Sequence, residues 1–331
     1  MPNTICQYPF DCCRINIDGN VSFCCWLLDK RLSLGNINTE PFEKIWNSPA
    51  ARSIRQDVLA GNYAQCSRET CLFLTRPARP DDNEFAPYPQ IVEFNLSREC
   101  NLSCVICRTA HTQYLDCEFE KFQEKIDKIY IPLLKNTRQI YLSGSDEPFV
   151  SRHCRLLIQR ILQTYPNIRF GFSTNGTLCS RKMLEDYGVC DKIDYLQISL
   201  HSATREMWLR FTRGSTEQYA RLMQNIGEMV ELKKSGKLGK LELNFVLTSV
   251  NYTELADFVR FAEKLSALVL IWGVRHADNI AVHFPTHQDY GKLKEILKDP
   301  VFDLPCVFLL PEIKKVRREA LEDARNVQDN L

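Results

Sequence analysis

Three cysteines with a spacing suited to metal chemistry stand at Cys100, Cys104 and Cys107, in a C-x3-C-x2-C pattern. Their thiolates can surround one face of a cubane iron–sulfur cluster, because the irons of such a cluster favour soft sulfur ligands. A closed structural zinc site needs four ligands, whereas three ligands leave one coordination position of the metal open. The spacing therefore predicts an iron–sulfur cluster with one iron open to a substrate or a cofactor.

A second group of cysteines precedes this loop. Cys6 and Cys24 flank a predicted β-hairpin with its turn at Asp18–Asn20, where an Asp-Gly pair supplies the positive φ that such turns require. Cys66 and Cys71 follow further along the chain. Four thiolates from two separated pairs can close a metal site completely, and either zinc or a second cluster would satisfy them.

The other cysteines bring the total to 15 in 331 residues, an odd number that makes a poor disulfide framework for a chain of this length. Three of them are alternative ligands for the second group: Cys12, Cys13 and Cys25. The rest we interpret as small apolar core residues: Cys117, Cys154, Cys179, Cys190 and Cys306. Metal or redox chemistry therefore explains the cysteine content better than disulfides do.

The predicted elements that must position these cysteines begin after a proline-rich segment, which we assign as a linker at 76–90. Six apolar segments of strand length span 91–96, 139–142, 168–173, 195–200, 242–247 and 268–274. Segments with helical periodicity span 118–134, 154–164, 216–234 and 253–265. Strands that alternate with helices predict a parallel sheet, whose chemistry lies at the carboxyl ends of its strands. The cysteine loop begins at such an end.

Composition and charge exclude several classes of protein. Apolar residues make up 44% and charged residues 25%, as in ordinary soluble globular proteins. Because 42 basic residues face 41 acidic ones, no overall basic field would attract nucleic acid or anionic membrane. The sequence has neither a signal peptide nor an apolar run long enough to span a bilayer. We therefore expect a cytoplasmic protein without nucleic-acid or membrane partners.

Further motifs follow the predicted strands in order. The sequence reads SGSDEP at 143–148 after the second strand, STNGT at 173–177 after the third, and ISLHSA at 198–203 after the fourth, where Arg213 and Gly214 follow. Together with the cysteine loop, these motifs resemble the radical S-adenosylmethionine (SAM) superfamily over about 91–276. Residues 6–75 resemble its SPASM type of auxiliary-cluster module, which here precedes the barrel.

The resemblance implies an α/β fold and a division into domains. A partial (β/α)6 TIM-type barrel would span 91–285, after a small cysteine-rich SPASM-like domain at 1–75. A C-terminal helical extension would span 286–331. The implied cofactors are SAM, a SAM-binding [4Fe-4S] cluster and a second, auxiliary [4Fe-4S] cluster.

Carried over residue by residue, the resemblance also assigns sites. The SAM-binding cluster would be held by Cys100, Cys104 and Cys107, and the auxiliary cluster by Cys6, Cys24, Cys66 and Cys71. The SAM molecule would be lined from the strand ends by Gly144, Asp146, Glu147, Ser173, Asn175, Ser199, Val246 and Trp272. In this set Gly144 and Glu147 would meet the amino group of SAM, with Asp146 as an alternative carboxylate. The serines and Asn175 would lie at its methionine or ribose part, and the last two residues at its adenine.

The implied activity is reductive cleavage of SAM to a 5′-deoxyadenosyl radical that abstracts hydrogen from a substrate. A peptide or protein side chain is the expected substrate, because many members with this auxiliary module act on peptides. A sugar or nucleoside-derived metabolite is the alternative. Flavodoxin or ferredoxin would supply the electron. A non-catalytic iron–sulfur protein that carries electrons or senses redox state, or a zinc scaffold, would need none of the SAM-site motifs. The sequence assigns no catalytic acid or base.

Overall fold

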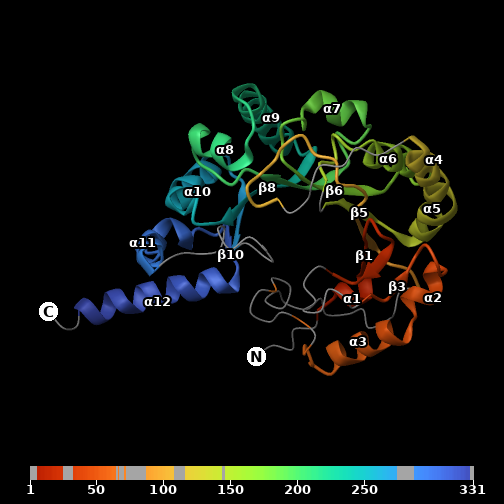
Figure 1. Ribbon diagram of the computed structural model, residues 1–331, viewed down its shortest axis with the longest axis horizontal. Helices are drawn as coiled ribbons and strands as arrows, with labels where there is room; N and C mark the ends of the chain where they lie inside the picture. Colours follow the sequence, from red (N-terminus) through yellow and green to blue (C-terminus); the bar gives the residue numbers. More distant parts are fainter. Residues whose placement is uncertain are drawn as a thin grey trace. The chain divides into compact units, whose positions relative to one another are not determined.

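The computed structural model describes residues 6–24, 33–64, 66, 71, 87–107, 116–143, 146–273 and 287–328. The chain divides into two compact units, the first formed by 1–100, 111–173 and 184–194 and the second by 101–110, 174–183 and 195–331. Each unit contains parallel strands that alternate with helices (Figure 1). The predicted mixed α/β fold with a parallel sheet is confirmed.

The first unit contains a sheet with the strand order β3-β2-β1-β4-β5-β6. Its strands are β1 (Cys12–Ile15), β2 (Asn20–Ser22), β3 (Gly35–Asn36), β4 (Ile91–Phe94), β5 (Gln139–Leu142) and β6 (Arg169–Thr174). The strands β4, β5 and β6 pair in parallel, whereas β1, β2 and β3 pair antiparallel. The predicted hairpin turn is present, because Gly19 has a φ of 85° and Asn16 N donates to Asn20 O (2.9 Å).

The N-terminal hairpin continues into the barrel sheet, which the sequence did not predict. Strand β1 pairs in parallel with β4, and Arg14 stands opposite Glu93 in this register. The pairing satisfies backbone groups on the outer edge of β4 that would otherwise face solvent. Most of the predicted linker at 76–90 lies outside the described residues, so the domain boundary stays a prediction.

The N-terminal module packs three short helices around a buried arginine. They are α1 (Tyr8–Asp11), α2 (Phe42–Trp46) and α3 (Pro49–Leu59). Arg55 of α3 is only 1% exposed. Its guanidinium donates to Pro9 O and Trp46 O, both at 2.8 Å, and lies 4.3 Å from the Trp46 ring centroid. Because a buried cation needs such partners, Arg55 ties these helices together.

The single helix predicted at 118–134 is interrupted in the structure. It divides into α4 (Asp116–Lys125), a π-helical segment at Ile126–Tyr130, α5 (Ile131–Leu133) and a 3-10 turn at Leu134–Asn136. The break coincides with Pro132, which has no N–H to donate within the helix. The next helix, α6 (Arg152–Thr164), packs against α4 and α5 (Figure 1). The following helix, α7 (Arg181–Asp186), comes after β6 in the chain.

The second unit has the strand order β7-β8-β9-β10. Its strands are β7 (Ile193–Ser199), β8 (Leu238–Leu247), β9 (Leu268–Gly273) and β10 (Val307–Leu309). Its helices are α8 (Arg205–Thr212), α9 (Thr216–Lys234), α10 (Leu255–Lys264), α11 (His287–Leu297) and α12 (Pro311–Gln328). The boundaries of α9 match those predicted, and the helix starts with a capping box in which Ser215 and Gln218 bond reciprocally.

The predicted helical extension over 286–331 contains the short strand β10 besides its helices. This strand pairs in parallel with β9, with Val307 opposite Val269. A three-residue strand has too few residues to show a period in sequence, so pairing with its neighbour defines it. None of the helices that the structure describes is both long and apolar enough to cross a membrane.

Candidate functional site

The loop that carries the C-x3-C-x2-C pattern follows β4. Cys100 and Cys104 are half-buried and Cys107 is exposed. The backbone turns sharply here, because Cys107 N donates to Cys104 O (2.9 Å). Three sulfur donors within one short loop fit the ligand preference of an iron–sulfur cluster. Among the described residues, no three His, Cys, Asp or Glu side chains are arranged as a metal site, so this ligand set stays a prediction.

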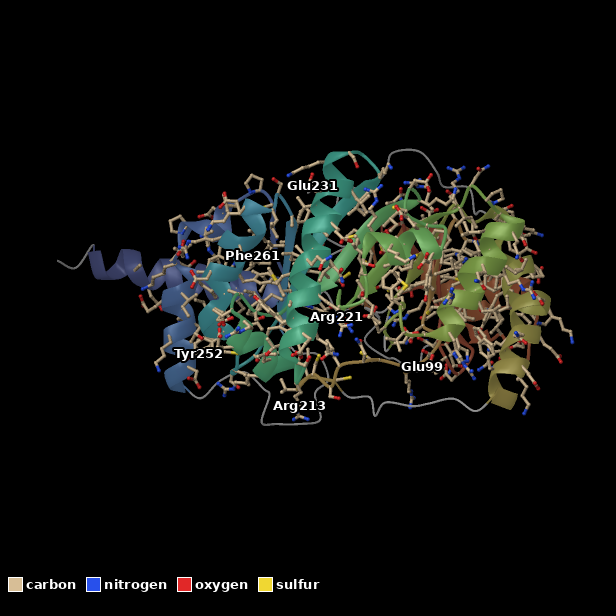
Figure 2. The ribbon with its side chains drawn as sticks, turned by 90° about the horizontal axis from the view of Figure 1, so that it is seen from above. Glu99, Arg213, Arg221, Glu231, Tyr252 and Phe261 are labelled. Carbon is tan, nitrogen blue, oxygen red and sulfur yellow. The ribbon has the colours of Figure 1, made fainter. Side chains whose placement is uncertain are left out.

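The connection between α8 and α9 supports the part of the loop that contains Cys104. Ser103 N donates to Thr212 O (3.2 Å) and Val105 N donates to Phe211 O (2.9 Å). Both acceptors belong to the last turn of α8, whose carbonyl groups have no partner inside the helix. Arg213 then takes a φ of 55° and ends the helix, and Figure 2 shows it near the start of α9. The loop backbone therefore caps α8.

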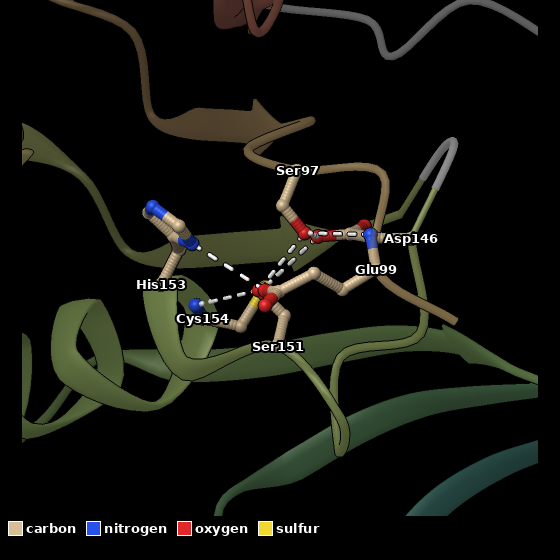
Figure 3. A network of polar contacts seen from close by, with 6 residues as sticks. All are labelled: Ser97, Glu99, Asp146, Ser151, His153 and Cys154. Carbon is tan, nitrogen blue, oxygen red and sulfur yellow. Dashed lines mark hydrogen bonds and ion pairs between the residues drawn. The ribbon is translucent and has the colours of Figure 1, made fainter. Parts of the chain in front are cut away.

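The predicted SAM-site motif after β5 contains two carboxylates with different surroundings, and Figure 3 shows those of Asp146. Asp146 Oδ2 lies 2.9 Å from Ser97 Oγ and 3.3 Å from Cys154 Sγ, and both can donate to it. Burial, its largest influence, raises the pKa of Asp146 to about 6, although these two hydrogen bonds oppose the rise. Asp146 is therefore held by groups of its own unit. Gly144 lies outside the described residues.

Glu147 is 1% exposed and stabilises the turn before α6. Its backbone N donates to Glu99 O (2.8 Å), and its Oε1 accepts from Phe149 N (3.3 Å). Glu99 in turn has its Oε2 3.4 Å from His153 Nδ1, and the His153 ring packs edge-on against Phe122. The bond from Glu147 N links the residue before Cys100 to the motif, and Figure 3 shows the contact between Glu99 and His153.

Sequence reasoning missed the residues that link the motif to α6. Ser97 Oγ lies 3.0 Å from Ser151 Oγ, and Ser151 caps α6 by accepting from Cys154 N (3.3 Å). His153 belongs to the same helix. The available signal was a serine directly after a predicted strand and another three residues before a predicted helix.

The predicted SAM-site residue Asn175 follows β6, and its side chain contacts the cysteine loop. Its Nδ2 donates to Asn101 Oδ1 (2.8 Å), and its Oδ1 accepts from Thr177 N (2.9 Å). Asn101 is the residue directly after Cys100. Ser173 and Ser199 are half-buried, near the ends of β6 and β7 respectively.

The predicted adenine-site residues are neighbours across two strands. Val246 of β8 stands opposite Trp272 of β9. Val246 N donates to His201 Nδ1 (3.1 Å), and burial lowers the pKa of His201 to about 4, which keeps the ring neutral. Asn251 Nδ2 donates to both His201 O (2.9 Å) and Val246 O (3.0 Å). His201 is therefore a buried residue of the core.

The second cysteine group lies in the N-terminal module. Burial, the largest influence, raises the pKa of Cys6 to about 12, and repulsion from the thiolate forms of Cys71 and Cys66 adds to the rise. Burial is also the main reason that the pKa of Cys12 is raised, and repulsion from the thiolate form of Cys24 is a smaller contribution. Cysteine thiolates are the ligands that an iron–sulfur cluster prefers. The ligand set stays a prediction: Cys6, Cys24, Cys66 and Cys71, with Cys12, Cys13 and Cys25 as alternatives.

The strands of the second unit carry polar side chains on the face away from their helices. Phe245 of β8 packs on Phe258 of α10, with ring centroids 4.9 Å apart. Successive side chains of a strand point to opposite faces of the sheet. Glu242 and Asn244 are an odd number of positions away from Phe245, so they lie on the face opposite to Phe245 and α10. Trp272 Nε1 donates to Asn244 Oδ1 (2.6 Å).

A hydrogen-bonded cluster occupies this polar face. Tyr195 Oη and Gln197 Nε2 both donate to Glu242 Oε1, each at 2.6 Å. Glu242 is 7% exposed, whereas the two donors on β7 are half-buried.

In the first unit, Glu93 lies 3.5 Å from Arg14 Nε and accepts from Ser143 Oγ (2.6 Å). The basic side chain of Arg14 is therefore paired with a carboxylate.

Family models match both parts of the chain. The model of the radical SAM superfamily matches residues 94–262, which is just over half of the chain. The model of the SPASM iron–sulfur cluster-binding domain matches residues 6–72.

Among individual proteins, a probable GTP 3′,8-cyclase of Sulfurisphaera tokodaii is 27% identical over 209 residues, which are 62% of this chain and 62% of that protein. The chain thus spans less than two thirds of this relative. SuiB of Streptococcus suis bound to S-adenosylmethionine is 16% identical at a TM-score of 0.43, covering 67% of this chain and 50% of SuiB. A radical SAM methyltransferase of Sphaerobacter thermophilus is 16% identical at a TM-score of 0.43, covering 64% and 63%.

Proposed function

Because the chain belongs to the radical SAM superfamily, we propose that it cleaves SAM reductively and abstracts a hydrogen atom from a substrate. The observation that carries the proposal is the cysteine loop, which stands directly after the first strand of the matched region and is supported by α8. The cofactors of the protein are SAM, a [4Fe-4S] cluster and the auxiliary iron–sulfur centre of the SPASM module. When bound, the SAM-site cluster supplies the electron that releases a 5′-deoxyadenosyl radical.

The chain's own residues would bind and orient these groups. We assign Cys100, Cys104 and Cys107 to the cluster, with the fourth iron left for SAM. We assign Glu147 to the amino group of SAM, as the family resemblance implies, with Asp146 as the alternative carboxylate. Asp146 Oδ2 already accepts hydrogen bonds from Ser97 and Cys154. A small reducing protein such as flavodoxin or ferredoxin is the proposed electron donor.

A peptide or protein side chain is the proposed substrate. The polar face of the second unit contains a nearly buried carboxylate at Glu242 and neutral groups at Tyr195, Gln197 and Asn244. A carboxylate at this face suits a neutral or cationic substrate, such as a peptide or an amine side chain, better than an anionic one. A triphosphate would instead require clustered cationic side chains. In the first unit, Arg14 is already engaged by Glu93.

The test of the chemistry is formation of 5′-deoxyadenosine. The reconstituted, reduced protein is incubated with SAM under anaerobic conditions, and the products are measured by mass spectrometry. We expect product from the wild type and from Cys306→Ala, since Cys306 lies far along the chain from both cysteine groups. Cys104→Ala should give none. Product formation that persists in Cys104→Ala would disprove the assignment of this loop.

A nucleotide is the second candidate substrate, because the relative of 27% identity is described as a probable GTP 3′,8-cyclase. The two candidates are separated by adding GTP, or short synthetic peptides that each present one class of side chain, to the same reaction. When the candidate substrate carries deuterium at its C–H bonds, hydrogen abstraction by the radical transfers deuterium from the substrate into 5′-deoxyadenosine. Faster turnover and deuterium transfer with GTP alone would overturn the peptide proposal.

A further inference from the structure

Asn101, the residue directly after Cys100, is held by three other side chains. Its Nδ2 donates to Thr177 Oγ1 (2.8 Å), and its Oδ1 accepts from Asn175 Nδ2 (2.8 Å). Its backbone carbonyl accepts from Gln218 Nε2 (3.1 Å). All of these residues belong to the second unit. The partners come from the turn after β6 and from the first turn of α9.

The side chains of Asn101, Thr177 and Asn175 form a closed ring of hydrogen bonds. Asn101 donates to Thr177, Thr177 Oγ1 donates to Asn175 Oδ1 (2.7 Å), and Asn175 donates back to Asn101. Each hydroxyl or amide in the ring both donates and accepts, so the bonds polarise one another in the same sense. Thr177 is 1% exposed, which shields the ring from water. Asn225 Nδ2 fixes the same turn by donating to Gly176 O (2.8 Å).

Gln218 connects the ring to helix α9. While its Nε2 binds Asn101 O, its Oε1 accepts from Ser215 N (2.8 Å) as part of the capping box. A single amide therefore caps the helix with its oxygen and holds the cysteine loop with its nitrogen. The bond from Gln218 to Asn101 and the bonds from Ser103 N and Val105 N to the end of α8 together fix the loop on both sides of Cys104.

We propose that Asn101, Asn175, Thr177 and Gln218 are positioning residues that hold the cysteine loop in shape for the cluster. In this role Asn175 acts through Asn101 and not by contact with SAM, which revises the role that the family resemblance implies. The proposal rests on the proposed function, because it assumes that Cys100, Cys104 and Cys107 hold the cluster. A loop that is already ordered loses little conformational entropy when it binds the cluster, so it releases the cluster slowly.

The test compares Gln218→Glu with Ser215→Ala in the reconstituted holoprotein. Glutamate keeps the oxygen that accepts from Ser215 N, but replaces the donor to Asn101 O with a second oxygen. Ser215→Ala is the matched control, since it removes the other half of the capping box, which does not touch the loop. Each protein is exposed to an iron chelator without oxygen, then reduced and examined by electron paramagnetic resonance. Only the part of the signal that shifts when SAM is added reports the SAM-binding cluster.

We expect Gln218→Glu to lose the SAM-responsive signal roughly fivefold faster than the wild type, the effect of about one hydrogen bond. Ser215→Ala should lose it at the wild-type rate, although its melting temperature falls because the helix cap is weakened. Equal rates of loss in Gln218→Glu and the wild type would overturn the positioning role, as would equal acceleration in both variants. A wild type without any SAM-responsive signal would instead overturn the proposed function.

Asn175→Ala separates positioning from direct contact with SAM. We expect faster loss of the SAM-responsive signal, and a dissociation constant for SAM within about twofold of the wild type when both proteins carry the cluster. A SAM affinity weakened about tenfold or more, with an unchanged rate of cluster loss, would show that Asn175 contacts SAM. That result would refute its positioning role.

Discussion

Replacing Gly214 with alanine should displace the support of the cysteine loop. Gly214 lies in the connection between α8 and α9, directly after Arg213. A Cβ atom there would stand 2.6 Å from Cη2 and from Cζ3 of Trp208, and 3.1 Å from Leu102 Cδ2. Trp208 is fully buried and Leu102 is 4% exposed, so neither side chain has free space to move into. The alanine must therefore push Leu102 and its loop outward, or shift the helix.

The size of the effect follows from the overlap. Carbon atoms in favourable contact are about 3.5–4.0 Å apart, so the new methyl group overlaps two ring atoms by about 1 Å. Overpacking of this kind in a dense core costs about 1–3 kcal/mol. Because Leu102 lies between Cys100 and Cys104, part of this strain falls on the loop. Faster loss of iron to a chelator should accompany the lower stability.

The assay is urea unfolding of the anaerobic holoprotein, with a glycine control and a rescue variant. Gly227→Ala is the control, because nothing lies within 4 Å of its Cβ position on α9, and it should stabilise the helix by about 0.5–1 kcal/mol. Trp208→Phe removes both clashing atoms, so it should restore most of the stability of Gly214→Ala. The reasoning would be refuted if Gly214→Ala left the free energy of unfolding unchanged. It would also be refuted if the double variant, Gly214→Ala with Trp208→Phe, were no more stable than Gly214→Ala alone.

Two buried ionisable groups predict opposite pH dependences of stability. Burial raises the pKa of Asp146 to about 6, so the folded state binds its proton more tightly than the unfolded chain does, and stability falls as pH rises through this range. Asp146→Asn should gain about 1 kcal/mol relative to the wild type between about pH 5 and about pH 7.5, measured by urea unfolding. Burial lowers the pKa of His201 to about 4, so stability falls as pH drops below about 6.5. His201→Asn, which keeps an acceptor for Val246 N, should gain about 2 kcal/mol relative to the wild type from about pH 7.5 down to about pH 5. A stability difference independent of pH would contradict either prediction.

The sequence predicted best those elements whose signals are local. Helix α9 has a capping serine, a helical period and a long run, and its predicted boundaries match. Strand β5 likewise matches at 139–142, because it alternates fully buried and half-buried residues. The continuous helix at 118–134 failed because Pro132 interrupts the hydrogen-bond ladder. Strand β10 and the pairing of β1 with β4 were missed because both depend on partners far away in the chain.

The candidate site shows the same limit in its chemistry. The cysteine pattern is readable because its three residues lie within eight positions, whereas the residues that hold it are dispersed. Asn101 and Thr177 are 76 positions apart, and Asn101 and Gln218 are 117 apart. The motifs at 173–177 and at Gly214 could be recognised as sequence patterns, and the resemblance assigned the first to SAM. In the structure both contact the cysteine loop: Asn175 binds Asn101, and Gly214 leaves room for Leu102. A pattern of residue types therefore records that a position is constrained, but the partner that constrains it is found only once the chain is folded.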